Sequence, residues 1–131
     1  TDAIHGTTDN ILFERQAELH AQVIQDPSFA AILVKRSKGE TDLDEIETIR
    51  WERYEMSLLD IWALAYMRHQ RELLGDRQWV AWDGYFASLF SNGAEKISPE
   101  RWQELEFGFD RGFWLHVQNS LFAERPQASS T

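Results

Sequence analysis

The sequence predicts an all-α protein: five or six helices in a bundle around one long central helix at about residues 42–74. Three observations support this. The seven Gly and three Pro of the 131 residues divide the chain at short intervals. Between these breaks the apolar residues recur at spacings of three and four, as on one face of a helix. No segment keeps the alternation of apolar and polar residues that indicates a strand, so we expect no sheet.

Composition limits the classes of protein to which the chain can belong. Apolar residues make up 43% and aromatic residues 13%, which is enough for one folded core, and we expect one domain over residues 1–125. Thirteen Lys and Arg against 22 Asp and Glu give a net charge of −9, which disfavours binding to nucleic acids or to anionic membranes. The absence of cysteine excludes disulfides and thiolate chemistry, and it is compatible with a cytoplasmic location.

The first two helices are predicted from their end residues. The first begins at a cap on Thr8 or Asp9 and ends near Gln25, and apolar residues follow one of its faces: Leu12, Leu19 and Val23. Asp26 then caps a second helix whose first residue is Pro27. That helix ends in basic residues before Gly39, at the negative end of its dipole.

The third helix is the long one. Thr41 opens it, with Asp44 at a spacing that resembles a capping box. The acidic run at residues 40–47 complements the positive end of the helix, and a cation site is the alternative interpretation. No Gly or Pro interrupts the pattern before Gly75, so the helix would span about 50 Å at 1.5 Å per residue. A compact chain of this length has a radius of gyration of about 14 Å, so the helix must cross the domain, bend or project beyond it.

Three further helices are expected in the last third of the chain. Asp76 begins a fourth helix that ends at Asn92-Gly93, and Ser98-Pro99 begins a fifth. A break near Gly108 separates the fifth helix from a last one over residues 111–123, for which Asp110 is the N-cap. The tail at residues 126–131 has nothing to bury and is expected to be disordered.

The order of these signals resembles an uncharacterised bacterial family of small all-helical proteins, many of which carry an N-terminal membrane anchor. The residues that carry the resemblance lie at 25–29, 42–45, 79–82 and 109–113 and at Trp102, and it covers about residues 10–122. Asp110-Arg111 stands where we expect Ser-Pro in that family. The resemblance implies the helical fold and a membrane tether upstream of Thr1, and it implies no catalytic residues.

Four residues are candidates for binding a ligand. His69 and His116 would meet across the bundle, which would allow a tetrapyrrole or a metal, although the sequence requires neither and we predict no cofactor. Asp60 is the one charge within the nearly apolar run at residues 58–67, so it needs an Arg partner or a place on the solvent side. Trp62 and the other aromatic residues supply an apolar interior, and we expect Trp62 and Trp82 to be core anchors.

Three residues are candidates for an interface. Trp51, Tyr54 and Met56 lie in the half of the long helix that would overhang a compact domain, where they would form an exposed apolar patch. Antiparallel pairing of two copies would cover it, so we expect a homodimer. The alternative is a monomer whose long helix bends and packs on its own first two helices.

These observations favour a non-enzymatic helical interaction or scaffold module that binds a protein partner or itself. The chain has none of the phosphate-binding or nucleophile motifs of common enzymes, and its histidines lack metal-ligand spacing. A bundle that binds a small ligand or a tetrapyrrole is the first alternative, and an acidic inhibitor protein is the second. We expect a cytoplasmic protein, with a tether to the inner membrane as the variant that the resemblance suggests.

Overall fold

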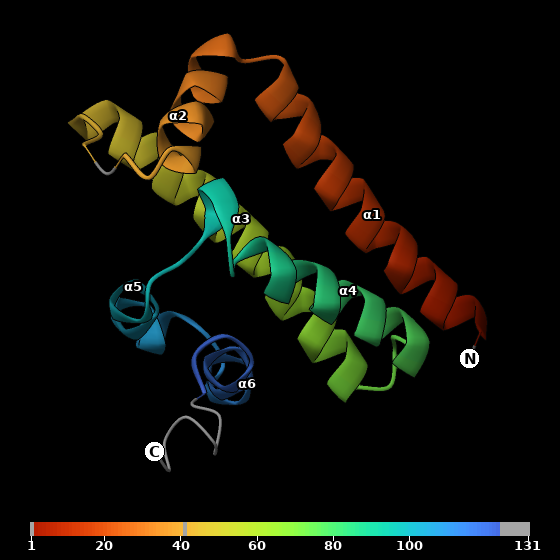
Figure 1. Cartoon of the computed structure of the whole chain (residues 1–131). Coiled ribbons are helices and arrows are strands. Elements are labelled where there is room, and N and C mark those ends of the chain that lie inside the picture. The colour runs from red at the N-terminus through yellow and green to blue at the C-terminus, as the bar shows by residue number, and fades with distance from the viewer. Residues whose placement is uncertain (1, 41, 124–131) are drawn as a thin grey trace.

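The computed structural model describes residues 2–40 and 42–123, without the side chains of residues 2–6 and 24. These residues form six α-helices and two short 3-10 turns and no strand, which confirms the all-α prediction (Figure 1). The elements are α1 (Asp2–Ile24), α2 (Pro27–Ser37), α3 (Glu45–Gln70), α4 (Asp76–Leu89), η1 (Gly93–Glu95), α5 (Pro99–Glu104), η2 (Glu106–Gly108) and α6 (Arg111–Phe122). The predicted disordered tail at 126–131 lies outside the described residues.

Helix α3 runs through the middle of the molecule and organises the other helices (Figure 1). It contacts α1, α2, α4 and α6, and α4 returns along it after a short turn. In the same view α1 lies on one side of α3, while α5 and α6 lie on the other. Because α2 folds back from the end of α1, it reaches the first half of α3 and the η1 turn.

Helix α3 is shorter than the predicted span of residues 42–74. At its start Asp44 and Glu47 form a reciprocal capping box: Glu47 N donates to Asp44 Oδ1 at 2.8 Å and Asp44 N donates to Glu47 Oε1 at 3.0 Å. The first helical residue is therefore Glu45. At its end Glu72 takes a left-handed conformation with φ 61°, and Leu73 N donates to Arg68 O at 2.8 Å. This is the Schellman termination that glycine usually makes. The 26 residues span about 39 Å.

The predicted start of the first helix is wrong, because α1 continues through both proposed cap residues and begins at Asp2. Thr8 is buried within the helix. The carboxylate of Asp9 accepts a hydrogen bond from Trp82 Nε1 at 2.7 Å and so joins α1 to α4. Of the predicted inner face, Leu12 and Leu19 are buried and Val23 is partly buried.

The other helix starts agree with the predictions. Asp26 accepts hydrogen bonds from the backbone of Ser28 and Phe29, Ser98 accepts one from Arg101 N, and Asp110 accepts one from Phe113 N. The break near Gly108 is the η2 turn. Helix α4 ends at Leu89 rather than at Asn92-Gly93, since η1 occupies residues 93–95.

Two apolar clusters form the core. In the larger one Trp62 is fully buried and its ring packs against those of Phe86, Phe90 and Phe113 from α4, the following turn and α6. Trp82 belongs to the same cluster, so the prediction that both tryptophans are core residues is confirmed. The smaller cluster is formed by Phe29, Ile32 and Trp51. It attaches α2 to the first half of α3.

Two glycines in helices are expected to respond in opposite ways to replacement by alanine. A Cβ atom on Gly84 would meet nothing within 4 Å. Gly84→Ala should therefore raise the free energy of unfolding by about 1 kcal/mol, the helix-propensity gain. A Cβ atom on Gly112 would lie 2.8 Å from Tyr66 Oη, and the Tyr66 ring packs against Trp79 and Phe113. Gly112→Ala should therefore lower it. Urea unfolding measures both, and equal gains would contradict the predicted clash.

Acid should destabilise the start of α2 and its link to α3. The hydrogen bond from the Ser28 hydroxyl leads the causes that lower the pKa of Asp26, and the Lys35 ammonium lowers that of Glu47. As pH falls below the ordinary values of 3.8 and 4.5, the unfolded chain takes up these two protons first. The free energy of unfolding should therefore stay level at neutral pH and decline below about pH 4.5. The variant D26N/E47Q should show a shallower decline in urea unfolding, and an unchanged slope would contradict this assignment.

Candidate functional site

The two candidate histidines lie against one tryptophan rather than against each other. Trp79 of α4 has its ring centroid 5.2 Å from that of His69 in α3 and 5.4 Å from that of His116 in α6. Each Nε2 is paired with its own carboxylate, His69 with Asp76 at 2.9 Å and His116 with Asp83 at 2.7 Å. The histidines therefore hold α3, α4 and α6 together around Trp79.

This arrangement gives no support to the tetrapyrrole or metal hypothesis, which stays a prediction. Both Nε2 atoms already have partners. Within the described residues, no three His, Asp or Glu side chains gather closely enough to hold a metal ion. Among the described residues, His69 Nδ1 is buried and has no hydrogen-bond partner, but one nitrogen atom does not make a metal site.

Trp62 and His116 converge on an acid that the sequence analysis did not single out. Asp83 Oδ1 accepts the hydrogen bond of Trp62 Nε1 at 2.9 Å and lies 2.7 Å from His116 Nε2. A buried indole N–H needs an acceptor, so an acidic residue on the facing helix was the signal that could have identified Asp83. Trp62 therefore has a structural role, because its ring is buried and its N–H group is bonded to Asp83.

Asp60 is exposed, and Arg15 of α1 is the charge that acts on it. Partial burial raises the pKa of Asp60, and the Arg15 guanidinium opposes that shift. Both residues line a shallow pocket of about 210 Å³ between α1 and α3. Both of the structural interpretations offered for this residue, a nearby Arg and a solvent-facing position, therefore apply to it.

The expectation that aromatic residues overhang on α3 is wrong. Trp51 is only 5% exposed, because the Arg36 guanidinium lies 4.0 Å over its ring. Tyr54 packs against Phe29 and donates a hydrogen bond to Glu95 at 3.1 Å, and Met56 packs on the larger core. Helix α2 and the η1 turn thus cover this half of α3, as in the monomer alternative. The homodimer stays a prediction that these three residues no longer support.

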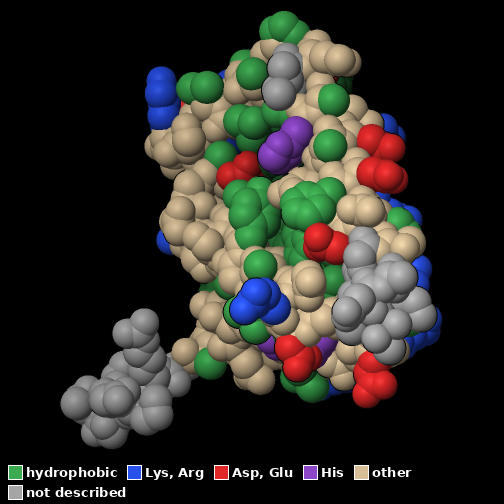
Figure 2. All heavy atoms as spheres, turned by 90° about the vertical axis from the view of Figure 1, so that its right-hand side faces the viewer, with side chains coloured by type: hydrophobic (Ala, Val, Ile, Leu, Met, Phe, Trp, Pro, Cys, Tyr) green, Lys and Arg blue, Asp and Glu red, His purple; other side chains and the backbone are tan. Residues whose placement is uncertain are grey.

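Other large apolar residues are exposed in the single chain. Figure 2 shows hydrophobic side chains gathered in the middle of the face that is on the right of Figure 1. The large apolar residues with substantial exposure include Phe13 of α1, Val80 and Tyr85 of α4 and Ile46 and Ile49 of α3. No contact among the described residues shows what would cover them.

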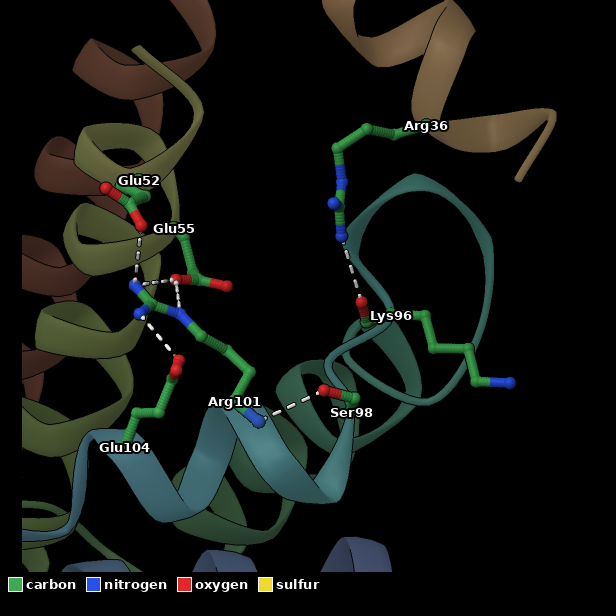
Figure 3. A network of polar contacts seen from close by, with 7 residues as sticks. All are labelled: Arg36, Glu52, Glu55, Lys96, Ser98, Arg101 and Glu104. Atoms are coloured by element: carbon green, nitrogen blue, oxygen red, sulfur yellow. Dashed lines mark hydrogen bonds and ion pairs between the residues drawn. The ribbon is translucent and has the colours of Figure 1, made fainter. Parts of the chain in front are cut away.

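A polar pocket of about 540 Å³ lies where the end of α2, the middle of α3, the η1 turn and α5 meet. Figure 3 shows its main polar side chains, which come from segments far apart in the sequence. Its lining residues are Arg36, Ser37, Gly39, Glu40, Leu43, Thr48, Trp51, Glu52, Glu55, Gly93, Lys96, Ile97, Ser98 and Arg101. Three of these side chains are basic and three are acidic, so the lining carries no net charge.

Glu55 and Arg101 form the floor of this pocket. The Glu55 side chain is 4% exposed, and its Oε1 atom accepts two hydrogen bonds from Arg101, from Nε at 2.9 Å and from Nη2 at 2.8 Å. Arg101 also pairs with Glu52 at 3.6 Å and with Glu104 at 3.3 Å. Burial is the largest single influence on the pKa of Arg101 and lowers it, but the hydrogen bonds and charges of Glu55, Glu104 and Glu52 together outweigh burial and raise that pKa. The guanidinium is thus fixed in its charged form by three carboxylates.

The second oxygen of Glu55 is free to bind a ligand. Among the described residues, Glu55 Oε2 makes no hydrogen bond and no ion pair. In Figure 3 this oxygen points away from Arg101, toward the side of the pocket on which Arg36 lies. The side chain as a whole is nearly buried, but Oε2 itself is not fully buried, so it opens into the pocket and is accessible to a ligand.

Arg36 forms the opposite wall. Its Nε donates to Ala94 O at 2.9 Å and its Nη2 donates to Lys96 O at 3.1 Å, while its plane rests on Trp51. Burial lowers the pKa of Arg36, and Glu55 and Glu95 oppose that effect. An arginine stays charged even so. Arg36 Nη1 has no hydrogen-bond partner among the described residues, so it is an available donor.

The serine side chains of the pocket already have hydrogen-bond partners. Its two serine hydroxyls are engaged with the backbone: Ser37 donates to Val34 O at 2.8 Å and Ser98 accepts from Arg101 N at 3.0 Å. The pocket instead offers a fixed acceptor and a fixed donor.

Comparison of the chain with protein-family models, curated proteins and solved structures finds no significant match. Over the described residues, no helix combines the length and the apolar character that crossing a membrane requires.

Proposed function

We propose that the protein is a non-enzymatic binding module and that its ligand occupies the pocket between Arg36 and Glu55. The observation that carries this proposal is the free Glu55 Oε2 atom, an acceptor without a protein partner that opens into the pocket from a nearly buried side chain. The pocket volume of about 540 Å³ lies within the usual range for small-molecule sites, about 300–1,000 Å³.

The pocket is organised before a ligand arrives. Arg101 is held by three carboxylates, and Arg36 is held by two backbone carbonyls and the Trp51 ring. Preorganised polar groups lose little conformational entropy on binding, which favours affinity. The small-ligand function that the sequence left as an alternative is therefore the one supported here, at a different site from the histidines.

An NMR titration tests this proposal. The side-chain N–H signals of Trp51, Arg36 and Arg101 report on the pocket, and that of Trp62 in the core is the control. The probes are glycine, L-leucine, putrescine, succinate and inorganic phosphate. We expect at least one probe to shift the pocket signals saturably while the Trp62 signal stays in place. If none of the five produces a saturable shift at the pocket, the proposed function is wrong.

Two expectations from the sequence remain separate proposals. These are a tether upstream of Thr1, which would carry the module at the inner membrane, and self-association or a protein partner. Sedimentation equilibrium at micromolar concentration tests self-association directly: the mass of one chain, unchanged on raising the concentration about tenfold, would contradict it.

A further inference from the structure

The chemistry of the two pocket walls specifies a class of ligand, an inference that rests on the proposed function. We propose that the pocket binds a free α-amino acid with an apolar side chain. Its ammonium group donates to Glu55 Oε2 and its carboxylate accepts from Arg36.

Glu55 Oε2 accepts hydrogen bonds and donates none, so its complement is a donor, and a positively charged donor forms the stronger bond. The surroundings reinforce this preference. Glu52, Glu55 and Glu104 all lie around the single positive charge of Arg101, which leaves an excess of two negative charges there.

Among the described residues no ion pair joins Arg36 to Glu55, and both line the pocket of about 540 Å³. The guanidinium favours a carboxylate, with which it forms charge-assisted hydrogen bonds. A ligand with only an amine would leave the Arg36 guanidinium without a carboxylate partner. A ligand with only a carboxylate would face the free oxygen of Glu55, which is also negatively charged.

Three basic and three acidic side chains line the pocket, so a ligand with no net charge preserves the balance. A zwitterion meets this condition and also matches both walls. Leu43, Trp51 and Ile97 contribute apolar surface to the same lining, which suits an apolar side chain.

Isothermal titration of the whole chain with L-leucine and two truncated analogues tests the inference. Isoamylamine is leucine without the carboxylate, and 4-methylpentanoate is leucine without the ammonium group. We expect leucine to bind and each analogue to bind at least about tenfold more weakly, the loss expected for one charge-assisted hydrogen bond. If either analogue binds as tightly as leucine, or leucine does not bind, the inference is overturned.

Substitutions test whether Glu55 is the residue that binds the ammonium group of leucine. Glu55→Gln keeps an oxygen acceptor for Arg101 but removes the charge, so leucine should bind about tenfold more weakly. The same variant should bind 4-methylpentanoate no more weakly than the unaltered chain does, because this ligand has no ammonium group. Glu100→Gln removes an exposed acid from the same helix as Arg101, outside the pocket lining, and should leave leucine binding unchanged. Equal losses in the two variants would overturn the assignment to Glu55. If the Glu55 variant does not fold, the comparison of leucine with its analogues on the unaltered chain still decides.

Failure of this inference differs from failure of the proposed function. If succinate or putrescine shifts the pocket signals and leucine does not, the protein is a binding module with another ligand class. If no probe in the NMR panel binds at the pocket, the proposed function and the inference are both wrong.

Discussion

Replacing Trp62 with Ala is expected to lower the free energy of unfolding by about 3–5 kcal/mol, the usual range for truncating a buried aromatic residue. The side chain has no exposed surface and packs against rings from α4 and α6. Its removal also leaves Asp83 without the indole N–H that it accepts at 2.9 Å. Urea denaturation, followed by the circular dichroism signal of helices at 222 nm, measures the change.

Two further variants separate the contributions to this loss. Trp62→Phe keeps an aromatic ring and removes the hydrogen bond, so it should cost less than Trp62→Ala. Phe107→Ala is the surface control, because Phe107 is 95% exposed and should change the free energy of unfolding by no more than about 0.5 kcal/mol. A cost below about 1 kcal/mol for Trp62→Ala would contradict the described core.

Replacing Glu55 with Ala is expected to cost about 3 kcal/mol, at the lower end of the range for breaking a buried ion pair. The lower end applies because the Arg101 side chain is 26% exposed and keeps Glu52 and Glu104 as partners. Glu52→Ala is the matched control on the same helix. It removes an exposed partner of the same arginine and should cost less than about 1 kcal/mol.

The double variant E55A/R101A tests whether the cost comes from the pair. Removing both partners leaves no unpaired buried charge, so the double variant should be more stable than the sum of the single changes predicts. Additive effects in urea unfolding would show that Glu55 acts through packing and not through Arg101.

Much of the helix pattern could be predicted because its signals are local. Asp26, Ser98 and Asp110 each cap the helix that follows them, and a cap needs only the next few residues. The start of α1 could not be predicted from Asp9, because that side chain bonds to Trp82, 73 residues away. A cap residue that a tertiary contact engages gives the same signal in the sequence as one that ends a helix.

The site was harder to predict than the fold. Asp60 drew attention because it interrupts an apolar run, yet it faces solvent. Glu55 was the informative acid, since it lies at helical spacing between Trp51 and Leu58 on the buried face of α3. That spacing could have identified Glu55 as buried. Its partner Arg101 follows 46 residues later, and only the folded chain brings them together.

The interface expectation failed for a physical reason. An uninterrupted pattern up to Gly75 suggested a helix of about 50 Å, too long to be covered by a small domain. The capping box at Asp44 and the left-handed Glu72 shorten it, and α2 folds back over its first half. Arg36 then covers Trp51 with its guanidinium, a contact that hydrophobic patterning does not reveal.

The most direct test of the central claim is a crystal structure of the protein grown with L-leucine. We expect electron density for the amino acid between Glu55 and Arg36, with its ammonium nitrogen about 2.8 Å from Glu55 Oε2. We also expect Arg101 to keep both hydrogen bonds to Glu55 Oε1. A structure in which Glu55 Oε2 is bonded to Arg36 and the pocket is closed, or in which leucine binds only elsewhere, would contradict the account.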